Sequence, residues 1–359
     1  MSKRSLVRES PVKTFLTFCV SIIYHRSRES RVTFPLISAF PGVVSCQRMG
    51  QYSLGVDMGG TNLRAAAIDD SGKMLDKIAG ATHLQAGRDA VIDDMVLSIE
   101  TLRARLGQHD LAGVGVGLPG FILMDKGYIV GSNNLPEFNN YPVRDEIERR
   151  LKAKVTLEND ANAAALGEKW MGAGRAVDDL VLLTLGTGVG GGIISGGRIL
   201  RGSVGMAGEI GHITVVPNGN PCGCGNTGCL EKHASATAIS AMARLVGLGH
   251  DLSSEEVFKA AVAGDERAKA IFRSMGEALG IALATLINIF NFPLYLLSGG
   301  PLPAWEFFAP AMIEEVRRRS FTYRNAPTRI ERATLGGEAG LYGAARLPFL
   351  AEAASPPAR

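Results

Sequence analysis

Glycine is concentrated in one part of this sequence, and this concentration limits how the chain can fold. There are 44 glycines, or about 12% of the 359 residues, where roughly 7% is usual. Fifteen of them lie between Leu180 and Cys229, without a collagen-like period. Glycine adopts backbone conformations that other residues avoid, and it lets the backbone approach a ligand closely. The stretch therefore predicts a backbone that turns tightly or lies against a bound ligand.

The first 48 residues differ in charge from the rest of the chain. Residues 1–50 carry eight Lys or Arg and two Glu, a net charge of +6, whereas the other 309 residues carry 30 basic and 33 acidic groups, a net charge of −3. The slightly acidic body argues against nucleic-acid binding. The apolar run 15–24 has ten residues, whereas a membrane-spanning helix needs about 20. Residues 1–48 are interpreted as a disordered or spurious extension, as a targeting segment, or as an ordered element.

Apolar runs separated by turn residues predict an α/β protein. The last twelve residues, 348–359, are expected to form a loose tail. Strands are expected near 52–56, 63–68, 73–78, 111–118, 154–157, 180–185, 294–297 and 329–333, and helices at 90–106, 143–151, 159–170, through most of 234–290, and at 304–319 and 338–347.

Two of the predicted strands run directly into turns rich in glycine and threonine. Backbone N–H groups in such turns can face a phosphate. Neither turn continues as Gly-Lys-Ser/Thr, so neither is a Walker A motif. The first turn alone could equally be an ordinary hairpin, but together with a later glycine pair the turns favour two lobes closing on a nucleotide. The candidate nucleotide-binding residues are Asp57, Gly59, Gly60, Thr61, Asn62, Thr187, Gly188, Gly299 and Gly300.

Three cysteines and a histidine have the spacing of a metal site. Cys222, Cys224 and Cys229 fall within eight residues, and His212 precedes the first of them by ten. Three thiolates and an imidazole make a closed tetrahedral zinc set, which is structural rather than catalytic. A disulfide or free thiols are the alternatives, although three clustered cysteines leave one unpaired. We therefore predict a structural Zn²⁺ ion and a reducing compartment, in which the thiols stay available.

The segment Glu158–Asn162 allows two interpretations. Asn or Asp before an alanine-rich helix is an ordinary N-cap. A kinase that acts on an alcohol, however, needs a carboxylate beside the attacking oxygen. Asp160 is the best candidate for that carboxylate, because it lies between the two glycine–threonine turns in the sequence. Both interpretations stay open at this point.

Several motifs together resemble the ROK family of sugar kinases and sugar-responsive repressors. They occur in the family's order and cover roughly 51–347, and the cysteine block beside GEIGH is the most specific of them. Within the family, the chain is most similar to bacterial glucokinases. The matching motifs are GVDMGGTN (55–62), GLPG (117–120), NNLP (133–136), LENDANAAALGE (157–168), LGTGVGGGI (185–193), GEIGH (208–212), CGCGNTGCLE (222–231) and SGGP (298–301).

The resemblance implies an actin-like ATPase fold, related to ribonuclease H, with two α/β lobes around a cleft. The first lobe would comprise 49–158 together with a returning helix at 338–347. The second would comprise 159–337 and include the zinc loop 208–231. Residues 1–48 and 348–359 would lie outside both lobes.

The resemblance also implies an activity and a site. The activity is ATP-dependent phosphorylation of the 6-hydroxyl of a hexose, with glucose as the expected substrate. Asp160 would be the general base, ATP phosphates would lie on Gly59–Thr61 and Thr187–Gly188, and Mg²⁺ would lie near Asp57. His212 would bind zinc through one nitrogen and the sugar through the other. The implied sugar-binding residues are Gly120, Asn134, Asn159, Asp160, Glu209, His212 and Glu231.

Other activities within the family remain as alternatives. N-acetylglucosamine, N-acetylmannosamine, mannose and fructose kinases would need the same set of acids and amides. A sugar-sensing repressor is a more distant alternative, because the 50 residues before the first strand show no helix–turn–helix pattern. The apolar run 281–297 is broken by Asn288, Asn291 and Pro293, so no membrane span is expected. A cytoplasmic homodimer that binds hexose and ATP is expected instead.

Overall fold

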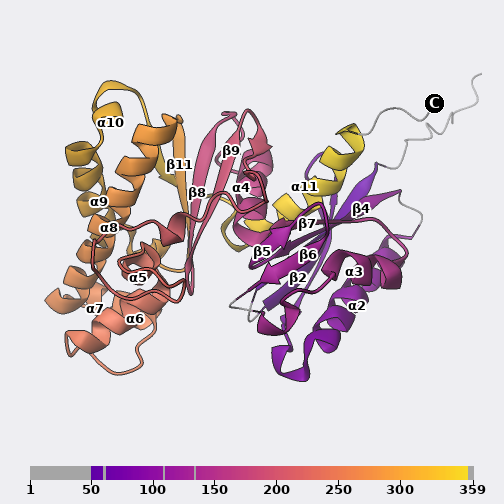
Figure 1. Ribbon diagram of the computed structural model, residues 1–359, viewed down its shortest axis with the longest axis horizontal. Coiled ribbons are helices and arrows are strands. Elements are labelled where there is room, and N and C mark those ends of the chain that lie inside the picture. Colours follow the sequence, from indigo (N-terminus) through magenta and orange to yellow (C-terminus); the bar gives the residue numbers. More distant parts are fainter. Residues whose placement is uncertain (1–49, 60–61, 108–109, 133–134, 355–359) are drawn as a thin grey trace, which may run out of the picture. The chain divides into compact units, whose positions relative to one another are not determined.

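The computed structural model describes residues 50–354 apart from 60–61, 108–109 and 133–134 (Figure 1). These residues belong to one compact unit, 49–359. The expectations for residues 1–48, Gly60, Thr61 and Asn134 lie outside the described residues.

The first half of the body is built on a five-stranded sheet with the order β3-β2-β1-β4-β7. Strands β1, β2 and β3 are antiparallel, whereas β4 and β7 continue the sheet in parallel with β1. Asp57 near the end of β1 pairs with Arg64 on β2, so the sheet brings an acidic and a basic side chain together at this corner. The strands are β1 (Tyr52–Met58), β2 (Asn62–Asp69), β3 (Met74–Ala81), β4 (Leu111–Leu118) and β7 (Val155–Asn159).

The second half repeats this arrangement in the order β10-β9-β8-β11-β12. Here too, three antiparallel strands are followed by two parallel ones. The turns after β1 and β8 therefore occupy equivalent corners of the two sheets. The strands are β8 (Leu180–Leu185), β9 (Val189–Ser195), β10 (Arg198–Ile199), β11 (Leu294–Gly299) and β12 (Arg329–Arg332).

Amphipathic helices accompany each sheet. Val91, Met95, Ile99 and Leu102 form the buried face of α2, as their helical spacing predicts. The helices of the first half are α2 (Arg88–Leu106) and α3 (Val143–Leu151), and those of the second half are α5 (Glu231–Ala234), α6 (Ala236–Leu245), α7 (Ser254–Val262), α8 (Glu266–Phe290), α9 (Trp305–Arg319) and α10 (Phe321–Asn325).

Two helices, α4 (Asp160–Met171) and α11 (Ala339–Ala354), lie between the sheets and pack against each other (Figure 1). Their backbones approach so closely that only glycine fits at the crossing. A Cβ atom on Gly167 would overlap the carbonyl oxygen of Ala339, and one on Gly343 would overlap that of Ala163. Close packing of this kind makes the interior sensitive to even one added methyl group.

The glycine-rich stretch is only partly made of turns. Gly190, Gly191 and Gly192 lie within strand β9, where we expected turns or ligand contact. A Cβ on Gly192 would clash with the carbonyl oxygen of Ala161 on α4, at 2.5 Å. Gly190 also faces Ala161, whereas Gly191 faces the carbonyl oxygen of Gly208, so these three glycines are required by close packing against a helix and a loop.

Two other features differ from expectation. A hairpin of β5 (Phe121–Leu123) and β6 (Tyr128–Gly131) follows β4, and no strand was predicted there. The last helix was expected to end at Leu347, but α11 continues through Pro348 to Ala354. Pro348 packs beside Gly113 of β4, where an added Cβ would lie 3.1 Å from the proline ring.

Helix α8 is long and apolar enough to cross a membrane, the one such helix in the described part of the chain. Within the fold, 67% of its most apolar window is buried, with Phe272, Met275 and Leu279 in the core of the second half. Core packing therefore accounts for its composition. The helix ends at Asn291, which has a left-handed φ of 50°, and Pro293 follows two residues later.

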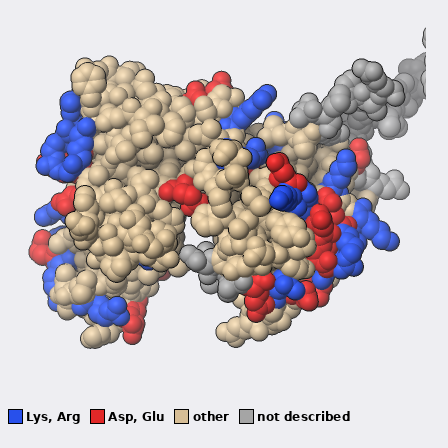
Figure 2. Space-filling model, in the orientation of Figure 1, with Lys and Arg blue, Asp and Glu red and all other residues tan. Residues whose placement is uncertain are grey.

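Charged side chains on α2 and α3 are interspersed rather than grouped by sign. Arg150 contacts Glu146 at 2.8 Å and also contacts Asp93. Figure 2 shows blue and red atoms mixed over this part of the visible face. Exposed ion pairs of this kind add little stability. Here they mean that this surface carries positive and negative charges side by side.

Candidate active site

The junction of β7 and α4 separates the two interpretations of the Glu158–Asn162 segment. Asn159 is the N-cap of α4, and its side-chain oxygen accepts hydrogen bonds from the backbone N–H groups of Ala161 (2.9 Å) and Asn162 (3.2 Å). Asp160 is the first helical residue, and it also accepts from the Ala161 N–H, at 2.9 Å. Because Asn159 caps the helix, the Asp160 carboxylate is not needed for that purpose.

Asp160 lies where two cavities meet. The first, called here the enclosed cavity, is lined by Gly120, Asn159, Asp160 and Glu209 among others. The second, called here the open cavity, has a volume of about 370 Å³, and its lining includes Asp57, Asp160 and the glycines described below. Asp160 thus belongs to the lining of both cavities.

Burial changes the acidity of the carboxyl groups at this junction. It raises the pKa of Asp160 to about 6, against the Ala161 N–H group that lowers it, and the charge of Asp57 adds to the rise. Burial also raises the pKa of Asp57, although the Arg64 guanidinium opposes this. Asp160 is therefore ionised at neutral pH while keeping a higher proton affinity than an ordinary aspartate.

Arg64 is the cationic side chain in the lining of the open cavity. It was not among the binding residues predicted from the sequence. Its guanidinium donates to Asp57 at 2.6 Å and to the carbonyl oxygen of Gly337. Its buried Nε has no hydrogen-bond partner. The pairing of Asp57 with Arg64 across β1 and β2 could have been found only from the strand register.

The predicted nucleotide residues separate into two groups. Asp57, Gly299 and Gly300 line the open cavity, together with Thr184. The remaining described candidates, Gly59, Asn62, Thr187 and Gly188, are not among the residues that line either cavity.

Hydrogen bonds explain the position of these turns. The N–H of Gly59 donates to Asn62 at 2.9 Å, which closes the first turn. The carbonyl of Thr187 accepts from the hydroxyl of Thr237 at 2.7 Å, which holds the second turn against α6.

The predicted sugar residues also separate. Gly120, Asn159, Asp160 and Glu209 line the enclosed cavity, whereas His212 and Glu231 do not. Gly120 has a left-handed φ of 123°, and a Cβ there would lie 2.7 Å from the carbonyl oxygen of Gly131, so no larger residue fits.

Glu209 lines the enclosed cavity and interacts electrostatically with His212 and Glu231, the two predicted sugar residues that do not line it. Burial raises the pKa of Glu209, while His212 opposes the rise and Glu231 adds to it. All three residues therefore belong to one electrostatic neighbourhood beside the cavity.

The four predicted metal ligands are brought together. The ligand atoms of His212, Cys222, Cys224 and Cys229 all lie within 4.8 Å of one another. The Cys224 and Cys229 sulfurs are 3.7 Å apart, and the Cys222 sulfur lies 3.6 Å from Nδ1 of His212. For Zn–S near 2.3 Å and Zn–N near 2.0–2.1 Å, a tetrahedron gives spacings of about 3.8 Å between sulfurs and about 3.6 Å between sulfur and nitrogen. The donor set therefore fits a zinc ion.

Two buried glutamates, one before and one after Asp160 in the sequence, were also missed. Glu158 is fully buried and accepts from Arg201 at 2.8 Å and from Asn162 at 3.1 Å. Glu168, also fully buried, accepts from backbone groups 166 residues away. Both lie in the LENDANAAALGE motif, but their partners are distant in sequence.

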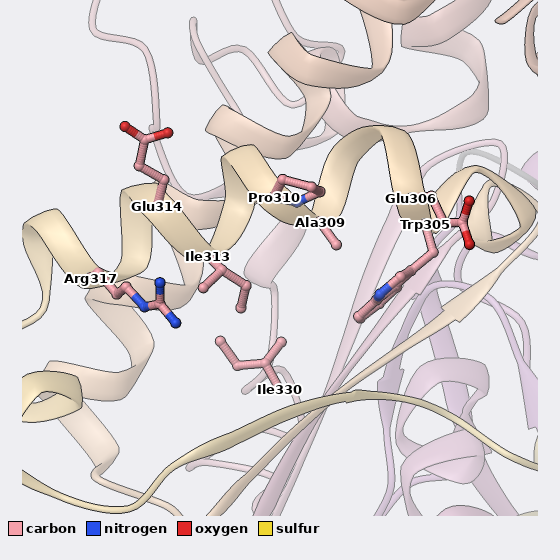
Figure 3. Close-up of a pocket in the computed structure, with 8 residues that line it drawn as sticks. All are labelled: Trp305, Glu306, Ala309, Pro310, Ile313, Glu314, Arg317 and Ile330. Carbon is pink, nitrogen blue, oxygen red and sulfur yellow. The ribbon is translucent and has the colours of Figure 1, made fainter.

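A larger cavity, of about 790 Å³, lies away from these residues, between α9 and β12. Trp305, Ile313 and Ile330 face the gap, whereas Glu314 points away from it (Figure 3). Its lining is mainly apolar, and none of the predicted site residues belongs to it.

Comparison with known proteins identifies the family. A model described as the ROK family matches residues 53–349. The chain belongs to the ROK family. The resemblance inferred from the motifs is thereby confirmed, and so is the actin-like α/β fold that it implied.

Proteins similar to this chain include kinases. A glucokinase of Halalkalibacterium halodurans is 39% identical over an alignment of 318 residues that covers 82% of this chain and 93% of that protein. The crystal structure of a ROK hexokinase from Thermus thermophilus has a TM-score of 0.77 at 34% identity and covers 85% of this chain and 100% of that one. A ROK glucokinase from Streptomyces griseus, in complex with glucose and AMPPNP, has a TM-score of 0.70 at 34% identity, covering 82% and 98% of the two chains.

Proposed function

We propose that this ROK protein is an ATP-dependent hexose kinase that converts glucose to glucose 6-phosphate. The observation that carries the proposal is the position of Asp160, which lines both the enclosed and the open cavity. A kinase needs a base between its acceptor and its phosphoryl donor. The glucokinases and the hexokinase to which the chain is similar support this choice of reaction.

In this proposal, the hexose binds among the residues of the enclosed cavity, whose volume of about 50 Å³ has to widen to admit it. Gly120, Asn159 and Glu209 would surround the sugar, with Asn134, His212 and Glu231 completing its contacts. Asp160 accepts the proton of the 6-hydroxyl as that oxygen attacks. With its pKa raised to about 6, the group is ionised at neutral pH and still basic enough to take the proton.

ATP would occupy the open cavity. Added Cβ atoms on Gly300 and Gly336 would meet nothing within 4 Å, so this wall leaves room for a ligand. Asp57 would hold Mg²⁺, which supplies charge neutralisation for the phosphates, and Arg64 would add a positive charge. The glycine–threonine turns, with Gly59, Gly60, Thr61 and Asn62 in one and Thr187 and Gly188 in the other, would reach the phosphates only if the walls of the cavity move together, as kinases close on their substrates.

A structural zinc ion would hold the 208–231 loop. His212 would bind it through Nδ1, the atom that faces Cys222, and Cys222, Cys224 and Cys229 would complete the tetrahedron. This leaves Nε2 of His212 available for a sugar hydroxyl. The thiolate ligands need a reducing compartment, which supports a cytoplasmic enzyme.

The assembly is proposed to be a homodimer, as the family resemblance implies. Light scattering coupled to size-exclusion chromatography would measure the mass in solution. A single species at 38 kDa, the mass of one chain, would contradict a dimer.

The test of the function is a coupled assay of ADP release with ATP and a panel of hexoses. The panel should contain glucose, mannose, fructose, N-acetylglucosamine and N-acetylmannosamine. We expect the highest kcat/KM with glucose, and the product should be glucose 6-phosphate. A higher kcat/KM with an N-acetylated sugar would move the assignment to another kinase of the family, and no turnover with any sugar would overturn it.

A further inference from the structure

Glu168 is a buried carboxylate whose partners are neutral groups. It lies near the end of α4 and is fully inaccessible to solvent. One oxygen accepts from the N–H groups of Thr334 (3.0 Å) and Leu335 (2.8 Å). The other accepts from the N–H of Ala173 (2.9 Å) and from the hydroxyl of Thr334 (3.3 Å). Burying a charge is costly unless it is well hydrogen-bonded, and these donors satisfy both oxygens.

The segment that Glu168 holds leads directly into one wall of the open cavity. Thr334 and Leu335 follow β12 and precede Gly336, Gly337 and Gly340, which line the cavity. Gly336 has a left-handed φ of 55°. A glycine turn has little conformational preference of its own, so its position depends on what anchors its ends.

Another part of the lining of the same cavity belongs to the helix that carries Glu168. Asp160, Ala161 and Ala164 line the cavity, and Ala161, Ala164 and Glu168 have the three- and four-residue spacing of one helix face. A single helix thus carries the candidate base at one end. Two turns later it carries the carboxylate that accepts hydrogen bonds from the segment leading into the glycine turn.

We propose that Glu168 is a positioning residue for the nucleotide. It fixes the Gly336–Gly337 turn at a set distance from α4, and therefore from Asp160. This inference rests on the proposed function in one respect: it takes the ligand of the open cavity to be ATP. The hydrogen bonds themselves involve no ligand.

The consequence is specific to one substrate. The Glu168 contacts reach the lining of the open cavity, whereas Thr334, Leu335 and the turn after them are absent from the lining of the enclosed cavity. Loss of the anchor should therefore weaken the binding of ATP and leave the binding of the hexose unchanged.

The test uses Glu168→Gln in the full-length protein. The amide keeps the shape of the side chain, but its NH₂ group cannot accept, so one pair of donors loses its acceptor. We expect the KM for ATP and the Kd of a non-hydrolysable ATP analogue to rise at least fivefold, with the KM for glucose within twofold of wild type. Lys169→Gln is the matched control, because it removes the neighbouring exposed ion pair with Asp178 and should leave all three constants unchanged.

The outcomes separate positioning from a purely structural role. A lower melting temperature with the ATP constants within twofold of wild type would overturn the proposal, and so would an equal rise in the KM for glucose. If Glu168→Gln does not fold, Thr334→Val decides: it removes one donor and keeps the backbone, so only the ATP constants should rise, by about twofold, and no rise would overturn the proposal. If wild type phosphorylates no hexose, the proposed function fails, while the analogue Kd still decides the role of Glu168.

Discussion

At the first turn of α4, two adjacent polar residues have different surroundings. Asn159 accepts from the free N–H groups of the helix, and Asp160 faces the two cavities. A cap and a base could not be told apart from residue types alone, because Asn and Asp are both good caps. The structure identifies Asn159 as the cap, because it precedes the first helical turn, and the role of Asp160 as the base stays a prediction.

Asp160→Asn tests the base directly. The amide cannot accept the 6-hydroxyl proton, so we expect kcat to fall by about 10²–10⁴, the usual share of general acid–base catalysis. The affinity for glucose should be retained, which equilibrium binding can measure. A kcat within tenfold of wild type would mean that another carboxylate is the base, with Glu209 the first alternative.

The same variant should be no less stable than wild type. The folded state raises the pKa of Asp160 from 3.8 to about 6, so it binds this proton more tightly than the unfolded chain does. Ionisation of Asp160 therefore lowers stability as pH rises between those two values. Thermal melts should show a higher melting temperature for Asp160→Asn than for wild type at pH 7, and a smaller difference at pH 4.

The pH dependence of turnover follows from the same pKa. Protonated Asp160 cannot act as a base, so kcat/KM for glucose should fall about tenfold per pH unit below pH 6. The profile can be measured with the coupled assay at saturating ATP. An acid limb near pH 4 instead would show that the carboxylate is as well solvated as an ordinary aspartate.

Among the elements, the 208–231 loop combines metal ligands with groups beside the enclosed cavity. Glu209, His212 and Glu231 interact electrostatically, and His212 is also one of the four clustered ligands. The position of the acids should therefore depend on the metal.

Cys224→Ser tests that dependence. A hydroxyl is a poor zinc ligand compared with a thiolate, so we expect zinc per chain to fall well below one and the Kd for glucose to rise at least tenfold. Metal analysis and glucose titration of the same preparation measure both. Wild-type protein that is fully active without zinc would contradict the expectation.

The crossing of α4 and α11 makes a different prediction. Alanine is favoured over glycine in a helix by about 1 kcal/mol, but overpacking a core costs about 1–3 kcal/mol. A Cβ on Gly343 would overlap the carbonyl oxygen of Ala163. The cost of this clash should exceed the gain in helix propensity, so Gly343→Ala should lower the free energy of unfolding. Gly80→Ala is the control, since a Cβ there meets nothing within 4 Å. Equal denaturation midpoints for the two variants would show that the helices can move apart freely.

At the scale of the whole molecule, the described body lies within a compact unit that begins at Met49. A chain that starts at Met49 should therefore have the kcat of the full-length protein and the same melting temperature. Both are measured on the two proteins side by side. A melting temperature several degrees lower in the shorter chain would show that residues 1–48 stabilise the body.

Local chemistry could be predicted from the sequence, and distant pairing could not. The strands Leu111–Leu118 and Leu180–Leu185 and the helix Val143–Leu151 have the predicted bounds, because their apolar runs end at clear turn signals. The clustering of His212 with the three cysteines could be predicted because the motif is short, whereas the role of Asp160 stays a prediction.

What was missed depends on contacts between distant segments. Arg64 faces Asp57 through the register of two strands, and Glu168 binds backbone groups 166 residues away. Strand β5 has only three residues, too few to show the alternation of a strand.

The α4–α11 crossing has one further consequence. Ala163 and Gly167 on one helix are four residues apart, as are Ala339 and Gly343 on the other, and each glycine meets the alanine of its counterpart. Each helix also follows the last strand of its own sheet. The contact is therefore isologous, like that of a symmetric dimer, except that both partners belong to one polypeptide. A Cβ added to either glycine would meet a carbonyl oxygen of the other helix, so the two halves of the chain depend on this crossing in the same way.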